Sequence, residues 1–118
     1  MKKIGLIGGI GPESTIEYYR QIIKRFQQKL NTKDYPELII NSINMTEMLG
    51  YVFNNQLDKL IDFLAGRIDV LEKSGAEFAA IASNTPHIVF DRLAEKVHVP
   101  LISIVEQTSI EIQRKRIN

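Results

Sequence analysis

The sequence predicts a doubly wound α/β domain, in which a four-stranded parallel sheet carries helices on both faces. Four short apolar runs alternate with segments whose apolar residues recur at three- and four-residue steps, the spacing of one helical face. The apolar runs are continuous, as is typical of strands buried on both faces of a parallel sheet. Right-handed crossovers between such strands then favour the flavodoxin-like strand order 2-1-3-4.

The first strand is predicted over residues 4–7, and a Gly-Gly-Ile-Gly-Pro turn at 8–12 closes it. A helix is expected to begin at Pro12, because a proline in the first helical turn loses no hydrogen bond there. Ser14 and Glu17 have the spacing of a capping box for this helix. The apolar positions that predict its inner face are Ile16, Tyr19, Ile22, Ile23, Phe26 and Leu30.

A second strand is predicted over residues 37–43, and a long amphipathic helix is predicted over residues 57–71. Gly75 is placed to end that helix. A third strand of small apolar residues follows at 78–82 and leads into the polar turn Ser-Asn-Thr-Pro at 83–86. That turn again carries a proline where a helix would begin.

The helix after this turn is predicted to have an inner face made of Ile88, Val89, Leu93 and Val97. A fourth strand is predicted over residues 101–105, and a final helix is predicted to end among the basic residues 114–116. No internal repeat, low-complexity tract or linker interrupts the pattern. We therefore expect residues 1–118 to form a single α/β domain.

The composition of the 118-residue chain is that of a soluble globular protein. Its 15 Lys and Arg against 14 Asp and Glu give a net charge of +1, too little for a broad nucleic-acid footprint. The chain has no cysteine, which excludes disulfides, thiolate zinc sites and a cysteine nucleophile, and its two histidines are too few for an all-nitrogen metal site. No apolar run approaches the about 20 residues of a membrane helix. We expect a cytoplasmic protein with no nucleic-acid partner, no membrane partner and no metal.

The predicted topology places a ligand site outside the carboxyl ends of the first and third strands, where the strand order reverses. The loops at 8–12 and 83–87 meet there, and each leads into a helix N-terminus that favours a small anion. Asn44, at the end of the second strand, is expected to border the same crevice. Each loop also has a purely structural interpretation, because glycines make tight turns and Asn84 and Thr85 can cap a helix.

Four other kinds of site are not supported by these loops. A phosphate-binding loop requires Gly-Lys-Ser/Thr, and a dinucleotide fingerprint requires a glycine at position 14, where the chain has serine. A serine hydrolase elbow requires Gly-x-Ser-x-Gly, which the surroundings of Ser83 do not match. Neither loop contains a lysine that could form a Schiff base with pyridoxal phosphate. We expect no nucleotide, pyridoxal phosphate or metal cofactor.

Two motifs resemble the aspartate/glutamate racemase family. The glycine-rich segment at 4–15, followed by Tyr-Tyr at 18–19, is similar to the start of these enzymes, and Ala-Ser-Asn-Thr-Pro-His at 82–87 is similar to their first catalytic motif, Ala-Cys-Asn-Thr-x-His. Members are cofactor-independent amino-acid racemases with two similar halves and an active site between them. Each half supplies one acid/base group, normally a thiol, on opposite faces of the substrate Cα. The resemblance covers the whole chain and implies that residues 1–118 correspond to the N-terminal half.

The resemblance also implies roles for individual residues. Ser83 occupies the position of the catalytic cysteine, and Asn84 and Thr85 would hold the substrate carboxylate and stabilise the charge that develops on it. Residues expected to line the rest of the pocket are Ile10, Gly11, Asn44 and Val52, of which Val52 stands at a position that is often polar in relatives. The implied function is a two-base racemisation of a small amino acid or dicarboxylic acid.

Two departures from the family pattern open an alternative. A serine hydroxyl is a much poorer base than a thiol, whose ordinary pKa near 8.5 can be lowered toward neutrality. The chain also corresponds to one half of a two-half enzyme, so we expect the isolated chain to be inactive. The alternative is a non-catalytic or vestigial half-domain that binds a small carboxylate, or that pairs with a second chain as a homodimer or with a missing second half.

Overall fold

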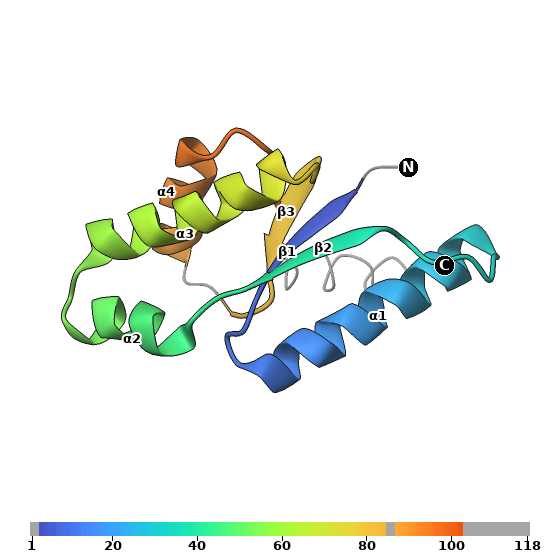
Figure 1. The fold of residues 1–118 in the computed structure, drawn as a ribbon, viewed down its shortest axis with the longest axis horizontal. Helices are drawn as coiled ribbons and strands as arrows, with labels where there is room; N and C mark the ends of the chain where they lie inside the picture. The colour runs from blue at the N-terminus through green and yellow to red at the C-terminus, as the bar shows by residue number, and fades with distance from the viewer. Residues whose placement is uncertain (1–2, 85–86, 103–118) are drawn as a thin grey trace.

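Four parallel strands form one sheet in the order β2-β1-β3-β4, which confirms the predicted fold class and strand order (Figure 1). The computed structural model describes residues 3–84 and 87–102. Along the chain the elements are β1 Ile4–Gly8, α1 Pro12–Leu30, β2 Leu38–Ser42, α2 Met45–Phe53, α3 Leu57–Lys73, β3 Phe78–Ile81, α4 His87–Lys96 and β4 Leu101–Ile102. In the register of the sheet, Leu6 of β1 lies opposite Ile40 of β2 and Ala80 of β3.

The helices cover both faces of the sheet, with α3 and α4 on one side and α1 on the other (Figure 1). Successive side chains of β1 point to opposite faces of the sheet. Leu6 therefore belongs to the apolar cluster under α1, and Ile7 belongs to the cluster under α3. Both side chains are completely buried. The central strand β1 is thus buried on both faces, as its continuous apolar run predicts.

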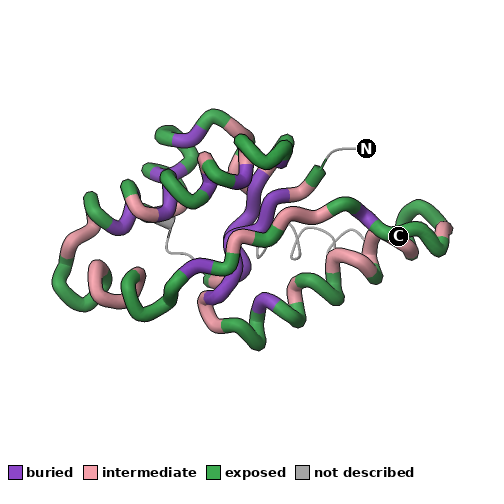
Figure 2. Tube along the Cα trace, in the orientation of Figure 1, coloured by how far each residue is buried: buried purple, intermediate pink, exposed green. Residues whose placement is uncertain are grey.

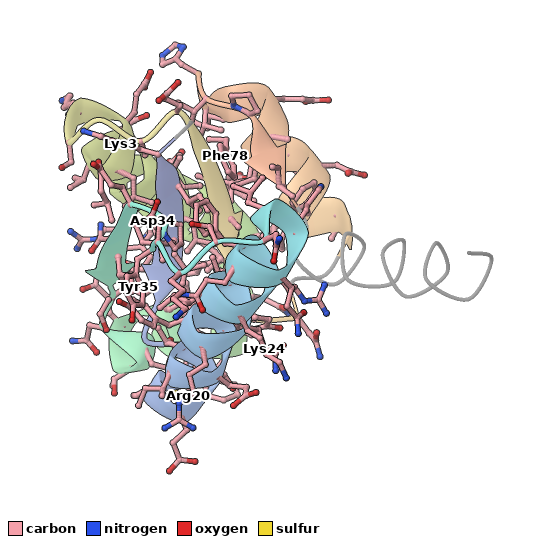
Figure 3. All side chains as sticks on the ribbon, turned by 90° about the vertical axis from the view of Figure 1, so that its right-hand side faces the viewer. Lys3, Arg20, Lys24, Asp34, Tyr35 and Phe78 are labelled. Atoms are coloured by element: carbon pink, nitrogen blue, oxygen red, sulfur yellow. The ribbon has the colours of Figure 1, made fainter. Side chains whose placement is uncertain are left out.

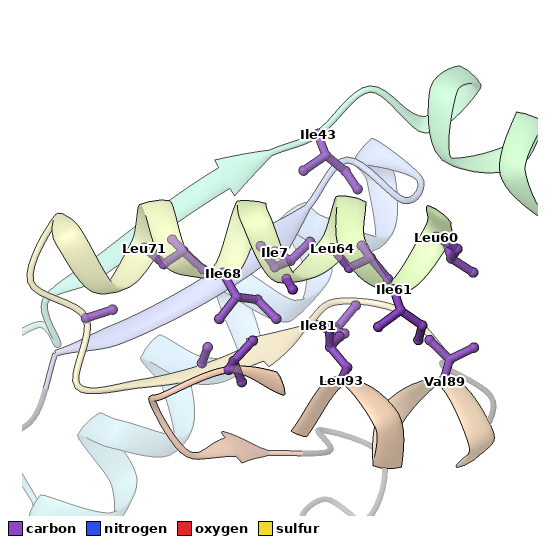
Figure 4. Packing of buried hydrophobic residues seen from close by; sticks show 14 residues of the cluster. Ile7, Ile43, Leu60, Ile61, Leu64, Ile68, Leu71, Ile81, Val89 and Leu93 are labelled. Atoms are coloured by element: carbon purple, nitrogen blue, oxygen red, sulfur yellow. The ribbon is translucent and has the colours of Figure 1, made fainter. Parts of the chain in front are cut away.

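The main core lies between the sheet and the α3–α4 layer (Figure 4). Ile68 and Leu71 of α3 and Leu93 of α4 are fully buried within it. Two surface ion pairs join the same helices, one between Arg92 and Asp58 at 2.6 Å and one between Lys96 and Asp62. The hydrogen bond from Arg92 holds the pKa of Asp58 below its ordinary value, and solvent screening keeps such exposed pairs weak.

The layer formed by α1 is much less buried than the sequence pattern predicts. Figure 2 shows α1 and β2 mostly exposed or half-buried, whereas β1 and β3 are largely buried. Ile16 and Tyr19, predicted for the inner face of α1, are exposed, whereas Ile22 packs against the sheet as predicted, together with Tyr18. Basic side chains such as Arg20 and Lys24 extend from α1 into solvent (Figure 3).

Three further details differ from the expectations. The N-cap of α1 is Gly11, so the capping box predicted for Ser14 and Glu17 is not formed. The edge strand β2 is only partly buried, because no described strand covers its outer side. Val89 and Leu93 of α4, and Val97 just after it, are buried as predicted, whereas Ile88 is 59% exposed.

The helix α2, which fills the connection between β2 and α3, was not predicted from the sequence. The predicted final helix and the end of the predicted fourth strand, residues 103–118, lie outside the described residues. Among the helices of the described part, none is both long enough and apolar enough to span a membrane.

Candidate active site

A cavity of about 480 Å³ lies at the carboxyl ends of β1 and β3, between these strands and the helices α2, α3 and α4. Its volume falls within the about 300–1,000 Å³ that is usual for small-molecule sites. Its walls are mostly aliphatic and aromatic. The described residues that line it are Ile10, Met48, Tyr51, Val52, Asn55, Gln56, Leu57, Leu60, Leu64, Ile81, Ser83, Asn84, Ile88 and Val89.

The glycine-rich loop after β1 places Ile10 in the cavity wall. Gly9 has a φ of +90°, and a Cβ atom there would lie 2.5 Å from the carbonyl oxygen of Ile43. Only glycine fits that conformation and that close approach. The buried hydroxyl of Thr15 accepts a hydrogen bond from the Gly9 N–H at 2.9 Å and donates one to the Gly11 carbonyl at 3.3 Å. The Gly9 N–H is therefore used within the loop rather than offered to an anion.

The end of β3 places Ser83 and Asn84 in the cavity wall, to which α2, α3 and α4 also contribute. The backbone N–H of Ala82 donates to the Ile7 carbonyl at 2.9 Å, which extends the pairing of β3 with β1 up to the cavity. Ser83 is half-buried and Asn84 is exposed. Thr85, predicted to bind the substrate carboxylate, and the side chain of His87 lie outside the described part of the structure.

Two of the predicted pocket residues have structural roles at helix starts. Gly11 is the N-cap of α1, and no atom outside its chain neighbours approaches within 4 Å of the place where its Cβ would lie. Asn44 is the N-cap of α2, where its Oδ1 accepts hydrogen bonds from the N–H groups of Thr46 at 3.0 Å and Glu47 at 3.4 Å. Neither residue is among those that line the cavity, whereas Ile10, Val52, Ser83 and Asn84 are.

The part of the cavity wall that α2 and the start of α3 contribute was not predicted from the sequence. Tyr51 lines the cavity, and its hydroxyl donates a hydrogen bond to Glu47 Oε2 at 3.2 Å. The Tyr51 ring packs at a tilt against Phe63, with centroids 5.6 Å apart, and the Arg67 guanidinium lies 5.0 Å from the Phe63 ring centroid. An available signal was the Asn44-x-x-Glu47 spacing before an apolar run, because it is typical of a helix start.

The hydrogen bond between Tyr51 and Glu47 changes the pH at which the tyrosine is expected to ionise. The hydrogen bond to the Glu47 carboxylate, followed by partial burial, raises the pKa of Tyr51 above its ordinary value. A raised pKa favours the protonated phenol in the folded state. The stabilisation it gives is therefore complete below the ordinary tyrosine pKa and is lost as the pH rises through the higher folded value.

In an ultraviolet titration of phenolate formation, we expect one tyrosine to ionise above the ordinary tyrosine pKa. This late component of the titration curve should disappear in Tyr51→Phe. Glu47→Gln should shift this component to lower pH, because the amide removes the negative charge that opposes ionisation. Tyr35→Phe, which changes a tyrosine outside the cavity wall, is the control and should leave the late component in place. A late component that survives in Tyr51→Phe would contradict this assignment.

Comparison with known proteins places the chain beside amino-acid racemases. A family model described as Asp/Glu/Hydantoin racemase matches residues 7–118. The chain is 32% identical over 114 residues to the broad specificity amino-acid racemase RacX of Bacillus subtilis (strain 168), and the match covers 92% of this chain and 48% of that protein. The chain spans about half the length of the relatives it matches.

Two solved structures share the fold. An aspartate racemase homologue from Pyrococcus horikoshii OT3 is 42% identical with a TM-score of 0.83, over 98% of this chain and 50% of that one. A protein from Yersinia pestis described as a candidate Asp/Glu racemase is 30% identical with a TM-score of 0.85, over the same shares of the two chains.

Proposed function

This chain belongs to the Asp/Glu/Hydantoin racemase family, and we propose that it forms one half of an amino-acid racemase that works without pyridoxal phosphate. The observation that carries the proposal is the cavity at the ends of β1 and β3, which has Ser83 and Asn84 in its wall. These two residues stand in the segment that resembles the family's first catalytic motif. In this assignment residues 1–118 are the N-terminal half of a two-half active site.

Racemisation removes the α-proton from one face of Cα and returns a proton to the other face, so it requires two positioned acid/base groups. We assign Ser83 to one face, and we assign the opposite face to a group from the second half. Asn84 and Thr85 would bind the substrate carboxylate and stabilise the negative charge that moves onto it when the Cα–H bond breaks. Ile10 and Val52 would contact the remainder of the substrate.

Apolar surface around the cavity mouth supports pairing with a second half. Val52 and Ile88 line the cavity, yet they are 45% and 59% exposed. Phe53, which follows Val52 at the end of α2, is 79% exposed. Exposed apolar side chains gathered at a site are typical of an interaction surface. A second racemase half that covers this mouth would also exclude water from the reacting groups.

The serine at position 83 favours a second candidate function. A serine hydroxyl gives up its proton far less readily than a thiol and is a weak general base. In the second candidate, the chain binds a small carboxylate at the same cavity but supplies no proton transfer. Both functions require an amino acid or related carboxylate in the cavity, and they differ in whether Ser83 exchanges a proton with Cα.

The test combines binding with α-proton exchange in D₂O. Amino acids added to the ¹⁵N-labelled 118-residue chain should shift amide resonances of Ile10, Ser83 and Asn84, while exchange at Cα stays near the buffer rate because the serine hydroxyl is a weak base. Inversion of configuration well above the buffer rate that disappears in Ser83→Ala would show that this half is catalytic alone and would contradict the two-half assignment. Amide shifts confined to the opposite edge of the sheet would contradict the proposed site.

A further inference from the structure

We propose that the cavity selects amino acids with uncharged, apolar side chains, of about leucine to phenylalanine size, over aspartate and glutamate. The inference rests on the proposed function, because it takes the ligand to be an amino acid with its carboxylate near Ser83 and Asn84. It adds the chemical class of the side chain, which follows from the mostly aliphatic lining of the cavity.

Most of the cavity lining is aliphatic, and a few uncharged polar side chains interrupt it. Ser83 and Asn84, where β3 ends, supply the hydroxyl and amide groups that suit an amino acid's carboxylate. The wall formed by α2 and α3 carries aliphatic side chains at Met48, Val52, Leu57, Leu60 and Leu64, together with Tyr51 and, between the two helices, the uncharged amides of Asn55 and Gln56. A ligand whose carboxylate binds Ser83 and Asn84 places its side chain against lining residues that are mostly aliphatic and carry no formal charge.

A second carboxylate on the ligand would be unfavourable at that wall. Moving a charge from water against aliphatic groups costs free energy unless a partner compensates it, whereas an apolar side chain gains from the same transfer. None of the described residues that line the cavity carries a formal charge. The apolar wall therefore opposes aspartate and favours leucine.

The charged residues of α2 and α3 described next do not favour a second carboxylate in the cavity. Glu47 accepts the hydrogen bond from the Tyr51 hydroxyl, so the charge that directly contacts this lining side chain is negative and would repel a second carboxylate. On α3, Asp58 pairs with Arg92 and Asp62 pairs with Lys96. These pairs lie between α3 and α4 at the surface.

Arg67 is the cation of α3 nearest to the aromatic part of this wall. Its guanidinium lies over the Phe63 ring, and Phe63 packs against Tyr51 but is not among the described residues that line the cavity. The charge of Arg67 lowers the pKa of Tyr51, but by less than Glu47 raises it. At this lining side chain the negative charge of Glu47 therefore outweighs the positive charge of Arg67.

Two matched variants test the selection. Val52 lies at the cavity mouth and Val70 lies on α3 away from the cavity, and the two side chains are 45% and 47% exposed, so arginine can be introduced at either position without filling a core site. The probes are the L and D forms of leucine, phenylalanine, aspartate and glutamate, titrated into the ¹⁵N-labelled 118-residue chain. Dissociation constants follow from the amide shifts of Ile10 and Asn84.

We expect leucine and phenylalanine to bind at least about tenfold more tightly than aspartate and glutamate. Val52→Arg should reverse this order, because it places a cation at the aliphatic wall, and Val70→Arg should leave every affinity within about twofold of the original chain. Equal binding of leucine and aspartate, or Val52→Arg and Val70→Arg behaving alike, would overturn the selection and leave the racemase assignment intact. Failure of every amino acid to shift the cavity resonances would overturn the proposed function and this inference with it.

Discussion

Gly9→Ala is expected to lower the free energy of unfolding by about 2–4 kcal/mol. The φ of +90° at this position is strained for any residue with a Cβ atom, and the added methyl would lie 2.5 Å from the Ile43 carbonyl oxygen. That oxygen belongs to the backbone just after β2, so the overlap can be relieved only by moving the loop or the strand end. The loss is a large share of the about 5–15 kcal/mol that stabilises a typical domain.

Two other glycines are the matched controls for this substitution. Gly11 has a φ of −74° and open space around the position of a Cβ, so Gly11→Ala in the same loop should change stability by less than about 1 kcal/mol. Gly66→Ala, within α3 and also in open space, should stabilise the chain by about 0.5–1 kcal/mol, because alanine favours the helix. Urea unfolding of the three variants measures all three effects, and a Gly9→Ala chain as stable as Gly11→Ala would contradict the strain argument.

The sheet could be predicted from the sequence because its strands are short apolar runs and its connections are helical. The central position of β1 follows from the same reasoning, since Leu6 and Ile7 are buried on opposite faces. The burial of α1 could be predicted only in part, because Ile22 packs against the sheet as expected but Tyr19 does not. A 3.6-residue period identifies an apolar stripe, but which part of it contacts the sheet depends on how the helix packs, and Tyr18 rather than Tyr19 does so here.

The helix α2 could not be identified by periodicity because it contains only nine residues and none of them is buried. Its start depends on a local cap, in which Asn44 accepts hydrogen bonds from the following backbone N–H groups. The wall of the cavity that contains Tyr51 therefore came from the structure. The position of Ser83 and Ile10 at the strand ends followed from topology, because parallel strands bring their carboxyl ends to one edge of the sheet.

Ile88 shows why the cavity also alters the pattern of α4. Its spacing from Val89 and Leu93 places it near the helix's apolar stripe, yet it is exposed and lines the cavity. An apolar residue at a ligand site satisfies the same sequence pattern as a core residue. The pattern could therefore not separate the two roles.

Ser83→Cys is expected to increase α-proton exchange by about 10²-fold or more over the original 118-residue chain. The thiol has an ordinary pKa near 8.5, so a useful fraction is thiolate at mildly alkaline pH and can remove the α-proton of a bound amino acid. The proton becomes part of the S–H group and exchanges with D₂O, and the same sulfur then returns a deuteron to the carbanion. The rate should rise with pH as the thiolate fraction rises.

A single acid/base group can act on one face of Cα only, so the exchange should proceed with retention of configuration and for one enantiomer of each amino acid. Mass spectrometry after chiral separation measures both deuterium uptake and inversion, with leucine and aspartate as probes. Ser74→Cys is the matched control, because Ser74 ends α3 with its hydroxyl donating to the Val70 carbonyl and is not among the described lining residues. That control should exchange at the buffer rate.

The possible outcomes separate the position of residue 83 from the need for a second half. Exchange in Ser83→Cys without inversion would place the sulfur beside Cα and leave the opposite face without a proton donor, as the two-half assignment requires. Inversion by the 118-residue variant would mean that one half reaches both faces. Exchange no faster than in Ser74→Cys would mean that the side chain at position 83 does not reach Cα, and the chain would then be a carboxylate-binding half without a catalytic group at this position.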